Sequence, residues 1–263
     1  MKKIIKYSTI AIATILLISG CSEDTPKVED GVKHETKHHS KHWGYSGDVS
    51  PAHWGELDEK FKMCSEGKQQ TPIDIKANKD IDLPALDLKY TKGSKNIIDN
   101  GHAVQVNVES GNIFNIDGTP YELKQFHFHT PSENHINGKS YPLEAHFVHA
   151  TKDGKLAVIA VMFEEGTMNP TLTKIIKKFP LEHNKAVPLT LSKEYIDVVM
   201  PTKREYYKFM GSLTTPPCSE QVKWFVFKTP QTASKVQIEA IHKQINKMNN
   251  RPIQPINGRE IDE

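Results

Sequence analysis

The sequence predicts a mainly β protein of the α+β class, with one extended sheet and a few short surface helices. Through the middle of the chain, short segments rich in β-branched and aromatic residues show the alternation of half-buried strands. Turn pairs such as Asp117-Gly118 and Asp153-Gly154 separate these segments. The predicted strands lie at 102–108, 123–129, 144–149, 156–163 and 222–227.

Two segments instead carry the signals of amphipathic helices. Asn169 and Pro170 mark a helix start, and apolar residues then recur at helical spacing through residue 179. Ser234 and Gln237 predict a capping box at the start of a second helix that runs past Ile241. Both are expected to pack on the surface of the sheet.

Composition limits the classes of partner. The chain has 263 residues, 37% of them hydrophobic, and a net charge of +2, which suffices for one large domain with a real core. Lysines and acidic residues are interspersed along the sequence rather than gathered into a basic stripe. We therefore expect no nucleic-acid partner.

The N-terminus predicts export. Lys2, Lys3 and Lys6 precede a short apolar run at 10–18, which is too short for a transmembrane helix and typical of a signal peptide at 1–20. The string Ile-Ser-Gly-Cys resembles a bacterial lipobox and predicts a lipid anchor on Cys21. The alternative is an ordinary cleavage site that precedes a cysteine. The lipobox interpretation predicts a protein anchored to the cell envelope, in the periplasm or on the cell surface.

Residues 21–41 are predicted to form a tether, and residues 42–263 are predicted to form the folded domain. The tether is rich in lysine and histidine and has almost no large apolar residue, so it cannot bury enough surface to order itself. Its histidines either bind metal or are simply solvated, and the sequence favours the second interpretation. These histidines are His34, His38, His39 and, at the boundary, His42.

Two further cysteines, Cys64 and Cys218, lie in the predicted domain. An even pair in an exported chain predicts a disulfide, with free buried thiols as the alternative. A disulfide that closes so long a loop stabilises the fold by about 4 to 5 kcal/mol in the chain-entropy model.

The string at residues 125–129 places two histidines on one face of a strand. Side chains alternate along a strand, so Gln125, His127 and His129 share a face, with Phe126 and Phe128 on the other. Two imidazoles at this spacing can share one metal ion, although this pattern alone is weak evidence.

A second strand strengthens the metal hypothesis. In the segment at 144–149, Glu144, His146 and Val148 share one face. If this strand pairs antiparallel with the first, His146 completes a site of three neutral imidazoles, which leaves a position open for water as catalytic zinc sites do. Gln125 and Glu144 then lie where they can accept ring N–H groups and orient the ligands.

The chain carries an ordered set of motifs between residues 42 and 259: HWGY at 42–45, QTPID at 70–74, NGH at 100–102, QFHFH at 125–129, SENH at 132–135, EAHFVH at 144–149, GSLTTPPC at 211–218 and RPIQ at 251–254. Together they resemble the alpha-class carbonic anhydrases, especially the secreted bacterial members. This family is itself the standard example of a three-histidine catalytic zinc site. The resemblance implies a fold with a large, mostly antiparallel, twisted central sheet. It also implies reversible hydration of carbon dioxide to bicarbonate by zinc-bound hydroxide, with weak esterase activity as a side reaction.

The resemblance also implies roles for individual residues. One zinc ion per chain is expected on His127, His129 and His146. Thr214 is expected to orient the hydroxide and to donate its own proton to Glu133. His102 is expected to shuttle protons, because an imidazole titrates near neutral pH, and Tyr45 to join the solvent network. The substrate pocket is expected to contain Val148, Val158, Leu213, Thr215, Val222 and Trp224.

The chain departs from the family pattern at Phe209, where a tyrosine is usual, so one hydroxyl of the hydrogen-bond network is missing.

Three competing interpretations are a non-catalytic binding module with this fold, a zinc-handling surface protein, and a dedicated zinc esterase. The retained histidines, Thr214 and Glu133 argue against the first. The sequence leaves the oligomeric state open, although secreted bacterial relatives are often homodimers.

Overall fold

A computed structural model describes residues 42–263 of the chain. The predicted signal peptide and tether lie outside the described residues, together with Cys21, His34, His38 and His39. Among the described residues, no helix has both the length and the apolar character needed to cross a membrane.

Most strands of the described chain belong to one sheet of 11 strands. A separate small sheet pairs β1 (Asp74–Ile75) with β7 (His135–Ile136). The strands of the main sheet are β2 (Asp87–Lys89), β3 (Ser94–Asp99), β4 (Val104–Val108), β5 (Ile113–Ile116), β6 (Thr119–His129), β8 (Leu143–Ala150), β9 (Leu156–Glu165), β10 (Val187–Pro188), β11 (Tyr206–Ser212), β12 (Glu220–Phe227) and β13 (Gln231–Ala233).

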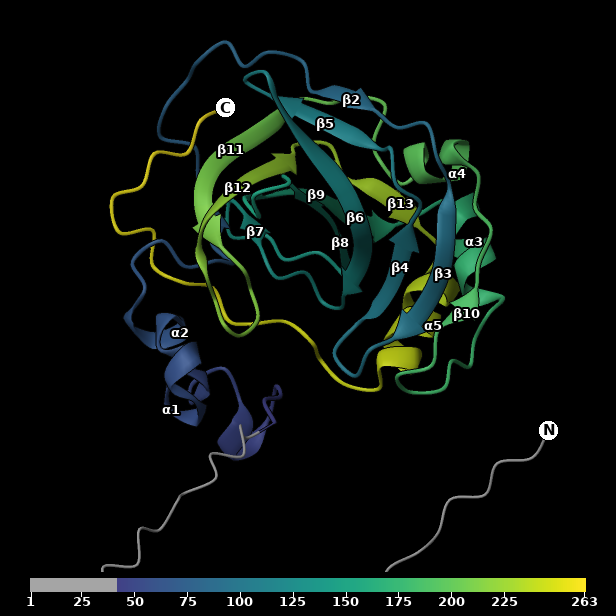
Figure 1. The fold of residues 1–263 in the computed structure, drawn as a ribbon, viewed down its shortest axis with the longest axis horizontal. Coiled ribbons are helices and arrows are strands. Elements are labelled where there is room, and N and C mark those ends of the chain that lie inside the picture. Colours follow the sequence, from purple (N-terminus) through teal and green to yellow (C-terminus); the bar gives the residue numbers. More distant parts are fainter. Residues whose placement is uncertain (1–41) are drawn as a thin grey trace, which may run out of the picture. The chain divides into compact units, whose positions relative to one another are not determined.

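The central strands run in the order β10-β3-β4-β6-β8-β9-β12-β11, and the sheet twists strongly along this order (Figure 1). β13 also pairs with β9, and β5 pairs with both β2 and β6. Neighbouring strands are antiparallel except that β12 and β13 run parallel to β9. The predicted large, mostly antiparallel sheet is therefore confirmed.

All five predicted strands are present, as β4, β6, β8, β9 and β12. The strand predicted from residue 102 begins only at Val104. The reason is a turn at Asn100, whose side-chain oxygen accepts hydrogen bonds from the backbone N–H groups of His102 and Ala103. This turn holds His102 outside the strand.

Both predicted helices are confirmed. α3 (Pro170–Ile176) begins at Asn169, whose side chain accepts hydrogen bonds from two backbone N–H groups of the first turn. α5 (Lys235–Ile245) has the predicted capping box between Ser234 and Gln237. The remaining helices are short: α1 (Trp54–Leu57), α2 (Met63–Glu66), α4 (Lys193–Asp197) and the 3-10 turns η1 (Gly47–Val49) and η2 (Glu59–Phe61).

The two faces of β6 and β8 have different surroundings. Phe126 and Phe128 of β6, with Phe147 of β8, point into the main hydrophobic core between the sheet and the helices α3 and α5. The opposite face of the same strands carries the histidines, and His129 and His146 are buried there although they are polar. Buried polar side chains need partners, so this face is where a binding site is expected.

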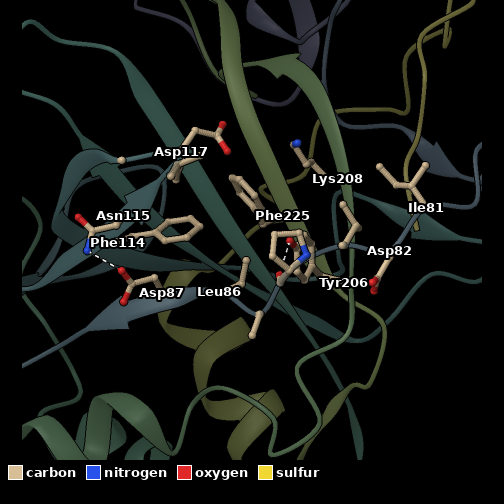
Figure 2. Close-up of a pocket in the computed structure, with 15 residues that line it drawn as sticks. Ile81, Asp82, Leu86, Asp87, Phe114, Asn115, Asp117, Tyr206, Lys208 and Phe225 are labelled. Carbon is tan, nitrogen blue, oxygen red and sulfur yellow. Dashed lines mark hydrogen bonds between the residues drawn. The ribbon is translucent and has the colours of Figure 1, made fainter.

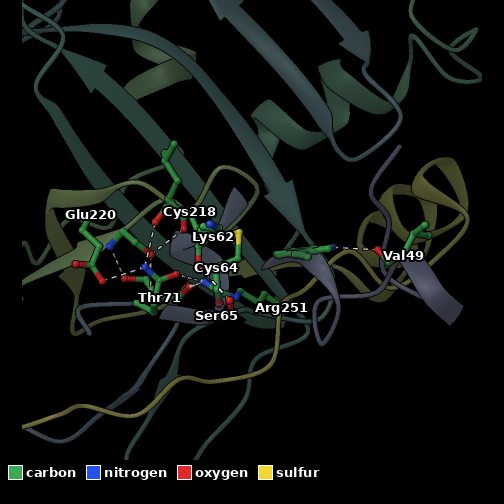
Figure 3. Close-up of a disulfide and its surroundings, with 12 residues drawn as sticks. Val49, Lys62, Cys64, Ser65, Thr71, Cys218, Glu220 and Arg251 are labelled. Carbon is green, nitrogen blue, oxygen red and sulfur yellow. Dashed lines mark hydrogen bonds between the residues drawn. A yellow bond between two sulfur atoms is a disulfide. The ribbon is translucent and has the colours of Figure 1, made fainter. Parts of the chain in front are cut away.

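The predicted disulfide between Cys64 and Cys218 is present, with the two Cα atoms 5.0 Å apart (Figure 3). It joins α2 to the segment that follows Thr214 and packs beside the buried Trp54. The guanidinium of Arg251 donates a hydrogen bond to the Cys64 carbonyl over 2.7 Å. The disulfide thus ties the N-terminal helices to the segments that lead to the histidine face.

Candidate metal centre

Three histidines converge on the polar face of β6 and β8. His127 lies directly opposite His146 in the antiparallel register, and His129 lies two residues further along the same strand. One nitrogen of each ring lies within 4.8 Å of one nitrogen of the other two, an arrangement that can hold a metal ion. The predicted pairing of the two strands therefore brings the predicted ligands together.

A different oxygen orients each ring. Gln125 Oε1 lies 2.8 Å from His127 Nδ1, and the Asn249 carbonyl oxygen lies 2.7 Å from His129 Nδ1. Glu144 Oε1 lies 2.9 Å from His146 Nε2. The nitrogens left to face the centre are therefore Nε2 of His127, Nε2 of His129 and Nδ1 of His146.

The donor set fits a divalent metal ion. His129 Nε2 is fully buried and has no hydrogen-bond partner among the described residues, which is costly unless a ligand occupies the site. Burial lowers the pKa values of His127 and His129, and for His127 the other two histidines lower it further. Neutral imidazoles are the form that binds metal, and three of them match a catalytic zinc site.

Glu144 is fully buried, and its carboxylate is well satisfied. It accepts hydrogen bonds from the backbone N–H groups of Glu133 and Asn134 at 2.7 and 3.0 Å, and from the Asn134 side-chain amide at 2.8 Å. Burial alone would raise the pKa of Glu144, but the contacts with His146 and Asn134 outweigh it and lower the pKa. The residue is therefore an anion that orients His146.

Glu133 lies against the same histidines. Its Oε2 is 3.4 Å from His129 Nε2 and 3.9 Å from His146 Nδ1, and its Oε1 accepts a 2.9 Å hydrogen bond from the Arg251 backbone N–H. Burial raises the pKa of Glu133 to about 7, against the opposing effects of His146, the Arg251 amide and the Thr214 hydroxyl. The predicted partners Thr214 and Glu133 thus lie within interaction range of each other.

Sequence reasoning missed Asn249, which follows α5. Its side chain accepts a hydrogen bond from Thr130 N–H at 2.9 Å and donates to the carbonyls of Phe128 and His102, each at 2.9 Å. No spacing rule singles out an asparagine in a loop. The only sequence signal nearby was the motif at 251–254, which begins two residues later.

A cavity of about 150 Å³ opens onto the histidines. Its lining includes His127 and His129 together with four predicted site residues: Tyr45, His102, Gln125 and Thr215. Trp43 and Asn100 complete part of the wall. The cavity therefore offers space for a small molecule beside His127 and His129.

A larger cavity, of about 450 Å³, lies elsewhere and shares no lining residue with the histidine site (Figure 2). Its lining has no histidine or cysteine. Some of its polar groups are already paired, since the Tyr206 hydroxyl donates to the Pro84 carbonyl and the Asn115 amide to Asp87. Its size therefore does not make it the better candidate for catalysis.

His102 stacks on Trp43, with ring centroids 3.6 Å apart and planes 10° from parallel. Burial lowers the pKa of His102 to about 4, and the charges of Lys247, His42 and His183 act in the same direction. This value lies below the near-neutral pKa that the sequence interpretation assumed. The difference arises because the ring is packed against an indole rather than surrounded by water.

The predicted apolar residues form a wall beside the histidines. Val158, Val222 and Trp224 belong to one buried cluster, against which Val148 and Leu213 pack. The ring of Trp224 lies 5.0 Å from that of His146, and the Phe209 ring stacks on the indole at 6.0 Å. The departure at Phe209 thus places a buried ring beside Trp224 in the same cluster.

Comparisons with known proteins agree with this site. The family model described as eukaryotic-type carbonic anhydrase matches residues 49–263. A carbonic anhydrase of Pectobacterium atrosepticum is 47% identical, over 84% of this chain and 91% of that protein. An alpha-carbonic anhydrase from Thermovibrio ammonificans, solved with the inhibitor sulfanilamide, is 43% identical with a TM-score of 0.81, over 84% of this chain and 99% of that one. Photobacterium profundum alpha-carbonic anhydrase is 47% identical with a TM-score of 0.79, and the match covers 84% of this chain and 100% of that one. The chain therefore belongs to the eukaryotic-type, or alpha-class, carbonic anhydrase family.

Proposed function

We propose that this carbonic anhydrase interconverts carbon dioxide and bicarbonate at a single zinc site formed by His127, His129 and His146. The observation that carries the proposal is the convergence of three imidazole nitrogens within 4.8 Å, beside a cavity and an apolar wall. When bound, zinc acts as a Lewis acid that brings the pKa of a water molecule close to neutrality, as is known for carbonic anhydrases in general.

Gln125, Glu144 and the Asn249 carbonyl have the role of holding the three rings in position. Each lies within 3 Å of the ring nitrogen that points away from the centre, at 2.8, 2.9 and 2.7 Å. Such partners fix the tautomer and the orientation of a ligand before the metal arrives. The site is therefore organised by side chains from β6 and β8 and by the C-terminal segment.

Thr214 and Glu133 have the role of directing the nucleophile. The Glu133 carboxylate is fixed by the Arg251 N–H, so it can accept the Thr214 hydroxyl proton. With its proton held in this way, the Thr214 oxygen is left to accept a hydrogen bond from the nucleophile. The hydrogen bond to Thr214 thereby orients the nucleophile so that one of its lone pairs points at the substrate.

Carbon dioxide has no charge to be gripped, so an apolar wall is the appropriate surface for it. Val148, Val158, Leu213, Val222 and Trp224 supply this wall, and Thr215 lies at the cavity. His102 and Tyr45 line the same cavity, and the proton-transfer role proposed for His102 requires that its pKa rise from about 4 toward neutrality in the working enzyme. Weak ester hydrolysis follows from the same nucleophile and needs no further residue.

We also propose that the enzyme is exported and held at the bacterial cell envelope by a lipid on Cys21. The support is the basic, apolar and small-residue pattern of residues 1–21. Placement in the periplasm or on the outer surface, and a homodimeric state, stay predictions that fractionation and sedimentation would test.

The function is tested with a chain from Ser40 to Glu263, which forms one compact unit. Zinc content and stopped-flow hydration of carbon dioxide are measured for this chain and for His127→Ala, with His242→Ala as the control. We expect one zinc per chain, fast hydration, and loss of both in His127→Ala only. His242 is exposed on α5 and is not a ligand. Bound zinc without hydration above background would overturn the enzyme assignment, and several zinc ions that survive His127→Ala would indicate a zinc-handling protein.

A further inference from the structure

Two segments far apart in the sequence, residues 166–180 and 234–248, form one surface, here named the α3–α5 face. α3 and α5 both pack against the main core and lie on the same side of the sheet (Figure 1). Gln237 accepts a hydrogen bond from Asn169 N–H at 2.9 Å, and Gln244 accepts one from Leu181 N–H at 2.8 Å. These two amides join the segments along the length of α5.

Positive charge is concentrated on this face. The two segments contain six lysines and a single acidic residue, Glu239, although the whole chain carries only +2. Among the described residues, only Lys235 of the six forms an ion pair, with Glu239 at 3.9 Å. The lysines are Lys174, Lys177, Lys178, Lys235, Lys243 and Lys247. The fold therefore joins two lysine-rich stretches of the sequence into one basic region.

Exposed apolar groups lie among these lysines. Met168 and Val236 are 61% and 71% exposed, and the residues that follow them, Asn169 and Gln237, are hydrogen-bonded to each other. A groove of about 670 Å³ between the helices is lined by apolar residues of both segments and by Lys243. Its apolar lining comes from Ile176, Phe179, Pro180 and Ala240.

We propose that the α3–α5 face docks on an anionic phospholipid surface. Lysine side chains can reach lipid phosphates while neighbouring apolar side chains enter the interfacial region, and this face offers both. A nucleic acid fits less well, because the two segments contain no arginine and expose methionine and valine instead. Charge complementarity with an anionic bilayer is the specific reason for the assignment.

The start of the described domain lies close to one end of this face. The His42 ring is 5.4 Å from that of His102, and the His102 carbonyl accepts a hydrogen bond from Asn249, which follows residue 248 directly. A lipid anchor at Cys21 would hold the domain near a bilayer without fixing which of its faces meets the lipid. The docking itself does not depend on that anchor, and its test omits Cys21.

The experiment measures cosedimentation of residues 40–263 with vesicles of phosphatidylcholine alone or mixed with phosphatidylglycerol. Solved relatives consist of the matching segment alone, so this part is a complete folded unit. The variant Lys177→Glu/Lys178→Glu/Lys243→Glu is compared with Lys60→Glu/Lys68→Glu/Lys152→Glu, which reverses three exposed lysines on other elements. Lys247 is left unchanged because its charge acts on His102.

We expect binding to the anionic vesicles only, weakened by salt between about 0.1 and 1 M. The first variant should bind at least about tenfold more weakly, since each lysine near an anionic surface contributes about fivefold. The control should bind like the wild-type chain, and both variants should hydrate carbon dioxide normally. Equal losses in both variants, or no preference for anionic vesicles, would overturn the proposal. Tight binding to a duplex oligonucleotide without binding to vesicles would reassign the face to nucleic acid.

The apolar part of the face has its own test. Met168→Ser/Val236→Ser removes the two exposed side chains and leaves every lysine in place. We expect this variant to bind anionic vesicles severalfold more weakly and to lose most of the binding that persists at about 1 M salt. Unchanged partitioning would overturn the apolar contact with the bilayer.

Discussion

The backbone carbonyl of Asn249 accepts a hydrogen bond from Nδ1 of His129 over 2.7 Å, so a metal ligand on β6 is oriented by a segment 120 residues later in the chain. The Asn249 side chain fixes this carbonyl by binding the backbone of Phe128, Thr130 and His102. One asparagine therefore links a zinc ligand, the backbone around it and the cavity-lining histidine.

Replacement of Asn249 by alanine should weaken zinc binding. The substitution removes three hydrogen bonds, two of them buried, and frees the carbonyl that orients His129. We expect a loss of zinc affinity of about 10- to 100-fold, the usual effect of losing a partner that orients a ligand. Competition with a zinc chelator measures this loss. Asn257→Ala, which removes one exposed hydrogen bond, is the control. Equal affinity in Asn249→Ala and the control would show that the carbonyl holds its position without the side chain.

Trp43→Ala should raise the pKa of His102. Burial is the main reason that the pKa of His102 is lowered to about 4, and the stacked Trp43 ring supplies part of that burial. Without the indole, the pKa should move up toward the ordinary histidine value of about 6.5. NMR titration of the His102 ring protons measures both values. Trp43→Phe, which keeps an aromatic neighbour, should shift the pKa less. A His102 that titrates at its ordinary value in the unmodified enzyme would contradict this account of its surroundings.

Removal of the disulfide should destabilise the fold without removing the zinc site. Cys64 and Cys218 close a loop of 154 residues, and loss of such a link costs about 2 to 5 kcal/mol. Urea denaturation of Cys64→Ser/Cys218→Ser measures the change in the free energy of unfolding. The unmodified chain under reducing conditions should unfold at the same urea concentration as the variant. If the oxidised chain and the double variant had the same midpoint, the link would not contribute to stability.

Local sequence patterns predicted much of this fold and the metal site. The alternation in β6 and β8 placed the three histidines on one face, and the capping residues Asn169 and Ser234 marked both longer helices. These features depend on neighbours within a few residues, which a sequence displays directly. The disulfide also followed, because only two cysteines remain in the predicted domain.

Other features depended on contacts between distant segments. Asn249 and the Arg251 amide reach the site only because the chain after α5 returns across β6. The low pKa of His102 follows from its packing on Trp43, 59 positions earlier in the sequence, which no local pattern reveals. The basic α3–α5 face likewise forms only when two lysine-rich stretches that are distant in the sequence are brought together.

A histidine outside the metal site predicts how stability depends on pH. His149 on β8 is fully buried, bonds the Tyr90 hydroxyl through Nε2 and packs against Phe114. Burial lowers its pKa to about 3, only partly opposed by backbone hydrogen bonds. The folded state therefore keeps this ring neutral at pH values where the unfolded chain, with an ordinary pKa of about 6.5, takes up a proton.

Between these two pKa values the unfolded state binds the extra proton, so the free energy of unfolding falls as the pH drops from about 6.5 to about 3. One such histidine contributes a slope of up to about 1.4 kcal/mol per pH unit, and above about 6.5 its contribution is constant. His149→Gln should reduce the slope by that amount, whatever its effect on stability at neutral pH. Urea denaturation at several pH values measures the slope, with the exposed His242→Gln as the control. Equal slopes for His149→Gln and the unmodified chain would mean that His149 becomes protonated in the folded state as readily as in the unfolded one.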